Sequence, residues 1–142
     1  MSSSHSHSPI VVTHEEGHRF SVTIGEHHLM VDQPRRGGGE DAGPAPLELL
    51  GASLGACVAF YVHQFCAARA IPDEDMRVEV RQHSAIAPHR IGAFEVRVVL
   101  PPEIPDAMLS LIQRVATSCP AHNTLVRGAD VSVRVETVVA AE

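Results

Sequence analysis

Lysine and tryptophan are absent from this 142-residue sequence, and its formal positive charge comes from 11 arginines. The 17 acidic residues outnumber them, which gives a net charge of −6 with neutral histidines. Because the arginines form no basic stripe, a nucleic-acid partner is not expected. Aromatic residues are scarce at 4%, but the hydrophobic share of 44% is that of an ordinary globular protein. We expect a single domain over residues 9–142, preceded by a disordered polar stretch at residues 1–8.

Cysteine is also scarce, with Cys57, Cys66 and Cys119 as the complete set. An odd number of cysteines makes a poor disulfide framework. The start of the chain, MSSSHSHSP, lacks the basic and apolar regions of a secretory signal, so we expect a cytoplasmic protein whose thiols are kept reduced. Pairing among these cysteines would therefore indicate catalysis rather than structural cross-linking.

Formal charge is missing from one long apolar run, Leu49 to Ala68, which has about the length of a membrane-spanning helix. The run nevertheless contains Gly51, Ser53 and His63, and no polybasic segment flanks it. These features favour a buried core helix over a membrane span. Because the helix is apolar on most sides, we expect the rest of the chain to cover it on most sides.

Alternating apolar residues predict strands at PIVVTH, GHRFSVTI and HHLMVD, the last two joined by a Gly-Glu turn. A loop rich in glycine and proline follows at residues 33–46, and Pro46 suits the first turn of a helix that reaches about Arg69. The segments RVEVRQHS and AFEVRVVL predict two more strands. Helices after Pro105 and Pro120 and a closing strand at DVSVRVETV complete an α+β fold with largely antiparallel pairing.

The three cysteines differ in what their surroundings predict. Cys57 and Cys66 lie among apolar helix residues, where a lone cysteine is usually an inert core residue. Cys119 precedes Pro120 at the expected N-cap of a short helix, where free backbone N–H groups favour a thiolate. From the residues alone, Cys119 is thus the better candidate for a reactive thiol.

His122, three residues after Cys119, either polarises that thiol or is an ordinary surface histidine. The pair also makes a Cys-x-x-His motif, which is at most half a zinc site, and no second half is present. The histidines near the N-terminus could bind a transition metal, but a polar disordered end explains them as well. No metal or other cofactor is therefore expected.

Two segments together, GEDAGPAPLELLGASLGACVAF and SCPAHNTL, resemble the OsmC/Ohr family of osmotically inducible and organic hydroperoxide resistance proteins. The resemblance extends from about His18 to Val135 and looks closest to the OsmC-like branch. It implies an OsmC-like α+β fold, with largely antiparallel sheets wrapped around a long central helix. It also implies a tightly intertwined homodimer with two active sites at the subunit interface.

The resemblance further implies a cofactor-free thiol peroxidase that reduces alkyl or fatty-acyl hydroperoxides. Cys57 would attack the peroxide and become a sulfenic acid, and Cys119 would condense with it to a disulfide. A dithiol, in this family commonly a dihydrolipoyl group, would then reopen the disulfide. The resemblance thus assigns the first step to Cys57, although the residues alone favour Cys119.

A thiolate in apolar surroundings needs a nearby cation, which in this sequence has to be an arginine. Arg36 in the glycine-rich loop and Arg19 on an early strand are the candidates, with Arg35 a weaker third. The family places a carboxylate partner for this arginine directly after the proline that opens the helix. Here Leu47 has that place and Glu48 follows, about 100° further around the helix. Glu48 either orients the arginine or complements the helix dipole.

Leu47 in place of the acid leaves two other functions open. One is a non-catalytic OsmC-like protein that binds an apolar or electrophilic small molecule in the interface cleft. The other is a redox sensor whose disulfide changes the surface presented to a partner.

Overall fold

The computed structural model describes residues 7–138, and the polar stretch predicted at residues 1–8 falls mostly outside them. The described chain forms two compact units, one from residues 7–55 and 78–97 and the other from residues 56–77 and 98–138. The central helix α1 (Pro46–Ala68) contributes its first part to the first unit and its remainder to the second.

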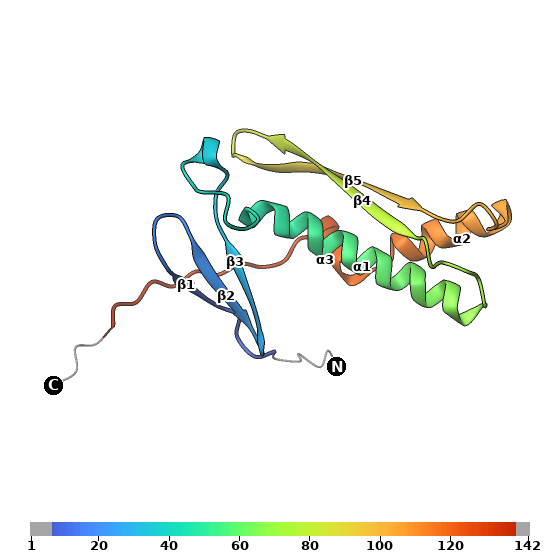
Figure 1. The fold of residues 1–142 in the computed structure, drawn as a ribbon, viewed down its shortest axis with the longest axis horizontal. Helices are drawn as coiled ribbons and strands as arrows, with labels where there is room; N and C mark the ends of the chain where they lie inside the picture. Colours follow the sequence, from blue (N-terminus) through green and yellow to red (C-terminus); the bar gives the residue numbers. More distant parts are fainter. Residues whose placement is uncertain (1–6, 139–142) are drawn as a thin grey trace. The chain divides into compact units, whose positions relative to one another are not determined.

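The first unit contains a three-stranded antiparallel sheet in the order β1 (Val11–His14), β2 (Phe20–Ile24) and β3 (His27–Val31), shown in Figure 1. Gly25 opens the turn between β2 and β3 with φ of +60°, a conformation that glycine adopts without strain. The register places Val22 opposite Leu29, and Val22 is buried. The predicted hairpin is thereby confirmed.

A second hairpin joins β4 (Arg77–Ala85) to β5 (Arg90–Val99), and residues 78–97 of it belong to the same unit. Gly51 and Gly55 of α1 let β4 approach closely, because a Cβ on Gly55 would lie 3.0 Å from a methyl carbon of Val80. A Cβ on Gly51 would lie 2.2 Å from the Gln82 side-chain oxygen. These glycines therefore serve helix–strand packing.

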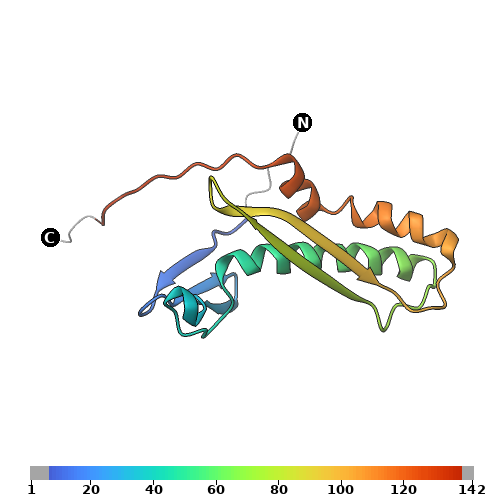
Figure 2. The same cartoon turned by 90° about the horizontal axis from the view of Figure 1, so that it is seen from above.

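The second unit consists of the later part of α1 with α2 (Asp106–Ala116) and α3 (Pro120–Arg127). In Figures 1 and 2, α2 runs beside the C-terminal half of α1. The core of this unit is apolar side chains and two thiols, all at most 7% exposed, from Val58, Val62, Cys66, Ile104, Ile112 and Cys119.

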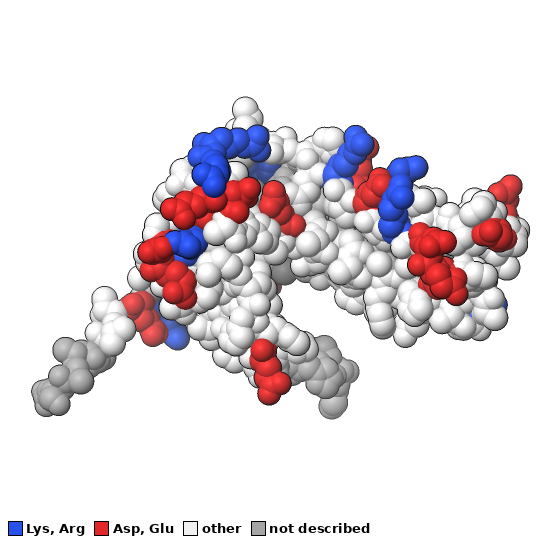
Figure 3. Space-filling model, in the orientation of Figure 1, with Lys and Arg blue, Asp and Glu red and all other residues white. Residues whose placement is uncertain are grey.

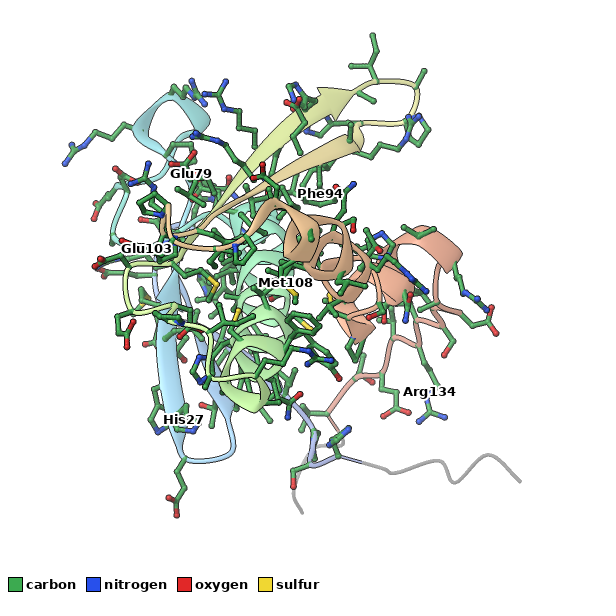
Figure 4. The ribbon with its side chains drawn as sticks, turned by 90° about the vertical axis from the view of Figure 1, so that its right-hand side faces the viewer. His27, Glu79, Phe94, Glu103, Met108 and Arg134 are labelled. Atoms are coloured by element: carbon green, nitrogen blue, oxygen red, sulfur yellow. The ribbon has the colours of Figure 1, made fainter. Side chains whose placement is uncertain are left out.

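The α+β class, the antiparallel sheets and the predicted order of elements as far as α3 are confirmed. The predicted closing strand is not formed, since residues 128–138 adopt no regular secondary structure. Val131, Val133 and Val135 are at least 84% exposed, and Arg134, labelled in Figure 4, lies on this extended segment. A strand needs a neighbour for its backbone N–H and C=O groups, and no described strand of the chain pairs with this segment.

The covering of α1 is also less complete than expected. Leu47, Leu50 and Phe60 are all exposed, and only 28% of the most apolar stretch of α1 is buried. Among the described helices, α1 alone is long and apolar enough to cross a membrane, with a mean hydropathy of 1.5. Core helices of soluble proteins share this length and composition, so the feature is weak evidence for a membrane span.

Candidate active site

Two of the three thiols meet inside the second unit. Cys57 projects from α1 and is half-buried, whereas Cys119 is fully buried at the N-cap of α3. Pro120 opens α3, and the Cys119 sulfur accepts the backbone N–H of His122 at 3.3 Å. The side chains of Cys57 and Cys119 lie within hydrogen-bonding reach of each other. The structure thus brings together the two cysteines that the sequence placed roughly sixty residues apart.

The pKa of the Cys119 thiol is raised above its ordinary value. Burial is the largest cause, and the hydrogen bond and charge of Cys57 raise the pKa further. The backbone N–H groups of His122 and Ala121 act in the opposite direction but do not outweigh these effects. The expectation from the residues alone, that the helix N-terminus makes Cys119 a thiolate, is therefore wrong, because desolvation exceeds the effect of the helix end.

Cys66 behaves as the sequence predicted for a core cysteine. It is fully buried on α1, and its carbonyl accepts the N–H of Ile71 at 2.9 Å where the helix ends. Burial raises the pKa of its thiol, and the charge of Asp73 raises it further, with Arg69 acting in the opposite direction. All three cysteines are free in this structure.

In the first unit, the glycine-rich loop after β3 is organised by one buried carboxylate. Asp32 is 1% exposed and accepts the backbone N–H groups of Gln33 at 2.7 Å and of Glu40 and Ala42 at 3.1 Å. Its own N–H donates to the carbonyl of Pro44 at 3.2 Å. Asp32 therefore closes the loop that carries the predicted arginines.

The sequence pattern did not single out Asp32, although an aspartate that opens a turn is a known signal for bonding to the following backbone. Burial raises the pKa of its carboxyl, but the three backbone N–H groups and the charge of Arg19 lower it more. The net pKa lies below the ordinary value for an aspartate. The loop thus depends on a charged, buried Asp32.

The candidate arginines occupy different surroundings in this unit. Arg19 forms an ion pair with Glu16, and its second carboxylate contact is Glu40 at 3.8 Å. It lines an open cavity of about 300 Å³ together with Asp32 and the backbone of Gly38 and Gly39. Glu16 and Glu40 carry no signal in the sequence that would have marked them as partners of Arg19.

Arg36 lies in the 3₁₀ turn η1 (Arg35–Gly37), and both arginines of this turn are exposed. On the face that Figure 3 shows, arginine and acidic side chains lie close together in several places. Arg19 is thus the candidate whose orientation is fixed by carboxylates, whereas Arg36 projects into solvent.

Glu48 caps the start of α1. Its carboxylate accepts the backbone N–H of Ala45 at 3.0 Å, and its own N–H donates to the Ala45 carbonyl at 2.9 Å. This is the contact of a first-turn acid, one of the two roles considered for it. The neighbouring Leu47 is exposed.

Within residues 7–138, no group of three or more His, Cys, Asp or Glu side chains is arranged to hold a metal ion. The Nε2–H of His14 donates to the carbonyl oxygen of Gly17, 3.0 Å away. His5, one of the N-terminal histidines considered for metal binding, lies outside the described residues.

The chain is thus α+β with two antiparallel sheets, and a cysteine on its central helix lies beside a Cys-Pro cysteine. The family model described as OsmC-like protein matches residues 37–134 of the sequence. The chain belongs to the OsmC family, and the predicted membership is confirmed. No curated protein matches the sequence.

Solved structures share this fold at low sequence identity. A Psychrobacter arcticus protein, described as an osmotic stress induced and detoxification response protein, has a TM-score of 0.77 at 20% identity, covering 84% of this chain and 89% of that one. An OsmC-like protein of Mycoplasma pneumoniae has a TM-score of 0.73 at 19% identity, covering 87% and 89%. The organic hydroperoxide resistance protein OsmC of Legionella pneumophila has a TM-score of 0.58 at 20% identity, covering 85% and 91%.

The role of Asp32 predicts an acid-sensitive loop. Because its pKa is lowered in the folded state, its contribution to stability is present above the ordinary aspartate pKa and is lost as the pH falls through the lowered one. Asp32→Asn replaces one acceptor oxygen with an N–H donor, so we expect a lower thermal unfolding midpoint than wild type at about pH 7. The difference should shrink toward about pH 3.

Asp75→Asn is the matched control, since Asp75 is exposed. Its midpoint should follow that of wild type at each pH. A difference between wild type and Asp32→Asn that is the same at both pH values would contradict the charged role of Asp32.

Proposed function

We propose that this protein is a cytoplasmic thiol peroxidase that reduces organic hydroperoxides to alcohols and works as a homodimer. The observation that carries the proposal is the contact between Cys57 and Cys119. Family membership supports it, since structural relatives include proteins described as organic hydroperoxide resistance proteins. The reaction requires no cofactor, nucleic acid or membrane.

In the first step, the Cys57 thiolate attacks the distal oxygen of the hydroperoxide. An S–O bond forms as the O–O bond breaks, and the alkoxide leaves as the alcohol after taking up a proton. Cys57 is then a sulfenic acid, oxidised by the two electrons that reduced the peroxide. The half-buried position of Cys57 allows a substrate to reach it, and its apolar neighbours on α1 suit an organic hydroperoxide.

In the second step, the Cys119 sulfur attacks the Cys57 sulfenic acid. The S–S bond forms, the S–O bond breaks, and water leaves. Because Cys119 is fully buried beside Cys57, the sulfenic acid meets this thiol before a second peroxide. A dithiol, such as a lipoylated protein, reopens the disulfide by exchange and restores both thiols.

A cation is needed to hold the Cys57 thiolate, and Arg19 or Arg36 supplies it in this proposal. The carboxylates of Glu16 and Glu40 orient Arg19, whereas Arg36 is exposed on its turn. In the structure, the Glu48 carboxylate accepts the backbone N–H of Ala45. We propose that Glu48 leaves this hydrogen bond in order to orient the arginine.

The dimer is supported by surfaces that the single chain leaves uncovered. Residues 130–138 keep the alternation of a strand, but the valines on one side of it are exposed. Leu50 and Phe60 of α1 are exposed as well. A second copy of the chain provides backbone partners for the extended segment and apolar cover for the helix.

A second candidate function is the binding of an apolar or electrophilic small molecule without turnover. The specific observation in its favour is that the Glu48 carboxylate contacts the backbone of Ala45, just before α1, while the preceding position is Leu47. Saturable binding of a fatty acid without hydroperoxide consumption would distinguish this function from the peroxidase.

The peroxidase proposal predicts the loss of two of the three thiols per chain. One equivalent of tert-butyl hydroperoxide is added to the fully reduced protein, and free thiols are then counted in denaturant. We expect a fall from three to one in wild type, because Cys57 and Cys119 form a disulfide. Cys57→Ser should keep both remaining thiols, whereas Cys119→Ser should lose the Cys57 thiol and form no intramolecular disulfide.

Cys66→Ser serves as the control, and it should lose both of its thiols. Turnover of the wild-type protein with a dihydrolipoyl dithiol is expected in the same assay. Survival of all three wild-type thiols would rule out the peroxidase and favour the ligand-binding function.

The dimer proposal predicts that one side of the C-terminal segment is sensitive to charge. Val133→Arg should raise the dimer dissociation constant about tenfold or more, since the burial of a valine contributes roughly 1.5–3 kcal/mol. Ser132→Arg, on the other side of an extended segment, should have a smaller effect. Sedimentation of the two variants measures both constants, and a wild-type protein that sediments as a monomer would contradict the proposal.

A further inference from the structure

Two aromatic residues follow Cys57 on α1 at the spacing of about one helical turn. Phe60 and Tyr61 lie three and four residues after the cysteine, in the part of α1 that belongs to the second unit. Residues at these spacings are neighbours on a helix surface, with Cβ atoms roughly 5–6 Å apart. The sequence contains four phenylalanines, one tyrosine and no tryptophan, so a large share of its few aromatic rings lies beside this thiol.

Helix geometry turns both side chains toward the cysteine. The Cα–Cβ bond of a helical residue is tilted toward the helix N-terminus, so the side chain covers the surface over the preceding turn. For Phe60 and Tyr61, the preceding turn is the one that carries Cys57. Because Cys57 is half-buried, a substrate that reaches its sulfur approaches over this surface.

The two rings contact each other and leave one of them open to a ligand. Their centroids lie 5.6 Å apart with 82° between the ring planes, which is an edge-to-face arrangement. Tyr61 is half-buried, whereas Phe60 is 55% exposed. Phe60 is therefore not a core residue of the chain. Its ring is instead an apolar surface already ordered by a neighbouring ring, which lowers the entropic cost of binding a ligand there.

We propose that Phe60 is a specificity-determining residue that favours hydroperoxides with an aryl group next to the peroxide. The inference rests on the proposed peroxidase function and does not change its chemical steps. In cumene hydroperoxide, the phenyl ring is separated from the reacting distal oxygen by the other oxygen and one carbon. A protein ring one helical turn from the thiol, about 5.4 Å along the axis, is within reach of that phenyl ring.

The contact distinguishes an aryl group from a saturated group of similar size. Both kinds of group lose water-exposed apolar area when they pack against Phe60. An aryl group also gains from an edge-to-face or offset arrangement with the ring of Phe60, which corresponds to roughly a two- to tenfold preference. Two hydroperoxides that differ only in aromaticity therefore separate the effect of the ring from general hydrophobicity.

The test compares cumene hydroperoxide with its ring-hydrogenated analogue, in which cyclohexyl replaces phenyl. Each is mixed with the fully reduced protein, and the second-order rate constant of thiol loss is measured without a reductant. Division by the rate constant for free cysteine removes the intrinsic reactivity of each hydroperoxide. We expect wild type to prefer cumene hydroperoxide roughly two- to tenfold.

Substitutions at two positions of α1 assign this preference to one ring. Phe60→Leu keeps an apolar side chain for the proposed dimer but removes the ring, so the preference should fall to about one. Phe60→Tyr keeps a ring and should keep the preference. Phe65→Leu is the matched control, because Phe65 lies about two turns after Cys57, and the Arg69 guanidinium carbon lies 3.8 Å from its ring centre. This control should match wild type.

Each variant is measured below its thermal unfolding midpoint, because an unfolded chain would also lose the preference. A preference that persists unchanged in Phe60→Leu would overturn the inference. Equal normalised rate constants for the two hydroperoxides in wild type would overturn it as well, and so would the same loss in Phe65→Leu. Any of these results leaves the peroxidase function standing. Loss of no thiol in wild type with either hydroperoxide would instead overturn the peroxidase function itself.

Discussion

The contact between Cys57 and Cys119 is the interaction on which the rest of the account depends. It joins a half-buried thiol on α1 to a fully buried thiol at the N-cap of α3. Burial raises the pKa of Cys119, whereas the backbone N–H groups at the N-terminus of α3 lower it, and the effect of burial is the larger one. In the proposed reaction the first step falls to Cys57, because the thiolate is the nucleophile and the raised pKa of Cys119 disfavours its thiolate.

In the first unit, a buried carboxylate organises the glycine-rich loop. Asp32 ties its loop together through three backbone N–H groups, and Gly39 and Gly43 allow the close packing that this requires. A Cβ on Gly43 would lie 2.2 Å from the carbonyl oxygen of Met30, which cannot move aside easily. The loop rich in glycine and proline is thus held by specific backbone contacts. Its arginines are presented by a defined backbone.

Local patterns predicted much of this structure. The Gly25 turn, the helix start at Pro46 and the cap at Cys119 each depend on residues close in sequence, and each is present. The pKa of Cys119 and the contact of Arg19 with Glu40 depend on residues far apart in the sequence, and hydrophobic periodicity gives no information about such contacts. The prediction of a strand at residues 130–138 is wrong for a related reason. A strand needs a neighbouring strand to bond its backbone groups, and the described part of the chain provides none for this segment.

The central claim is tested most directly by mapping the disulfide after treatment with one equivalent of hydroperoxide. Chymotrypsin cuts after Phe60 and Tyr61, between Cys57 and Cys66, so digestion without reductant yields separate peptides for the two cysteines. We expect a peptide containing Cys57 linked to one containing Cys119, with Cys66 free. A link that involves Cys66, or no link between Cys57 and Cys119, would contradict the central claim.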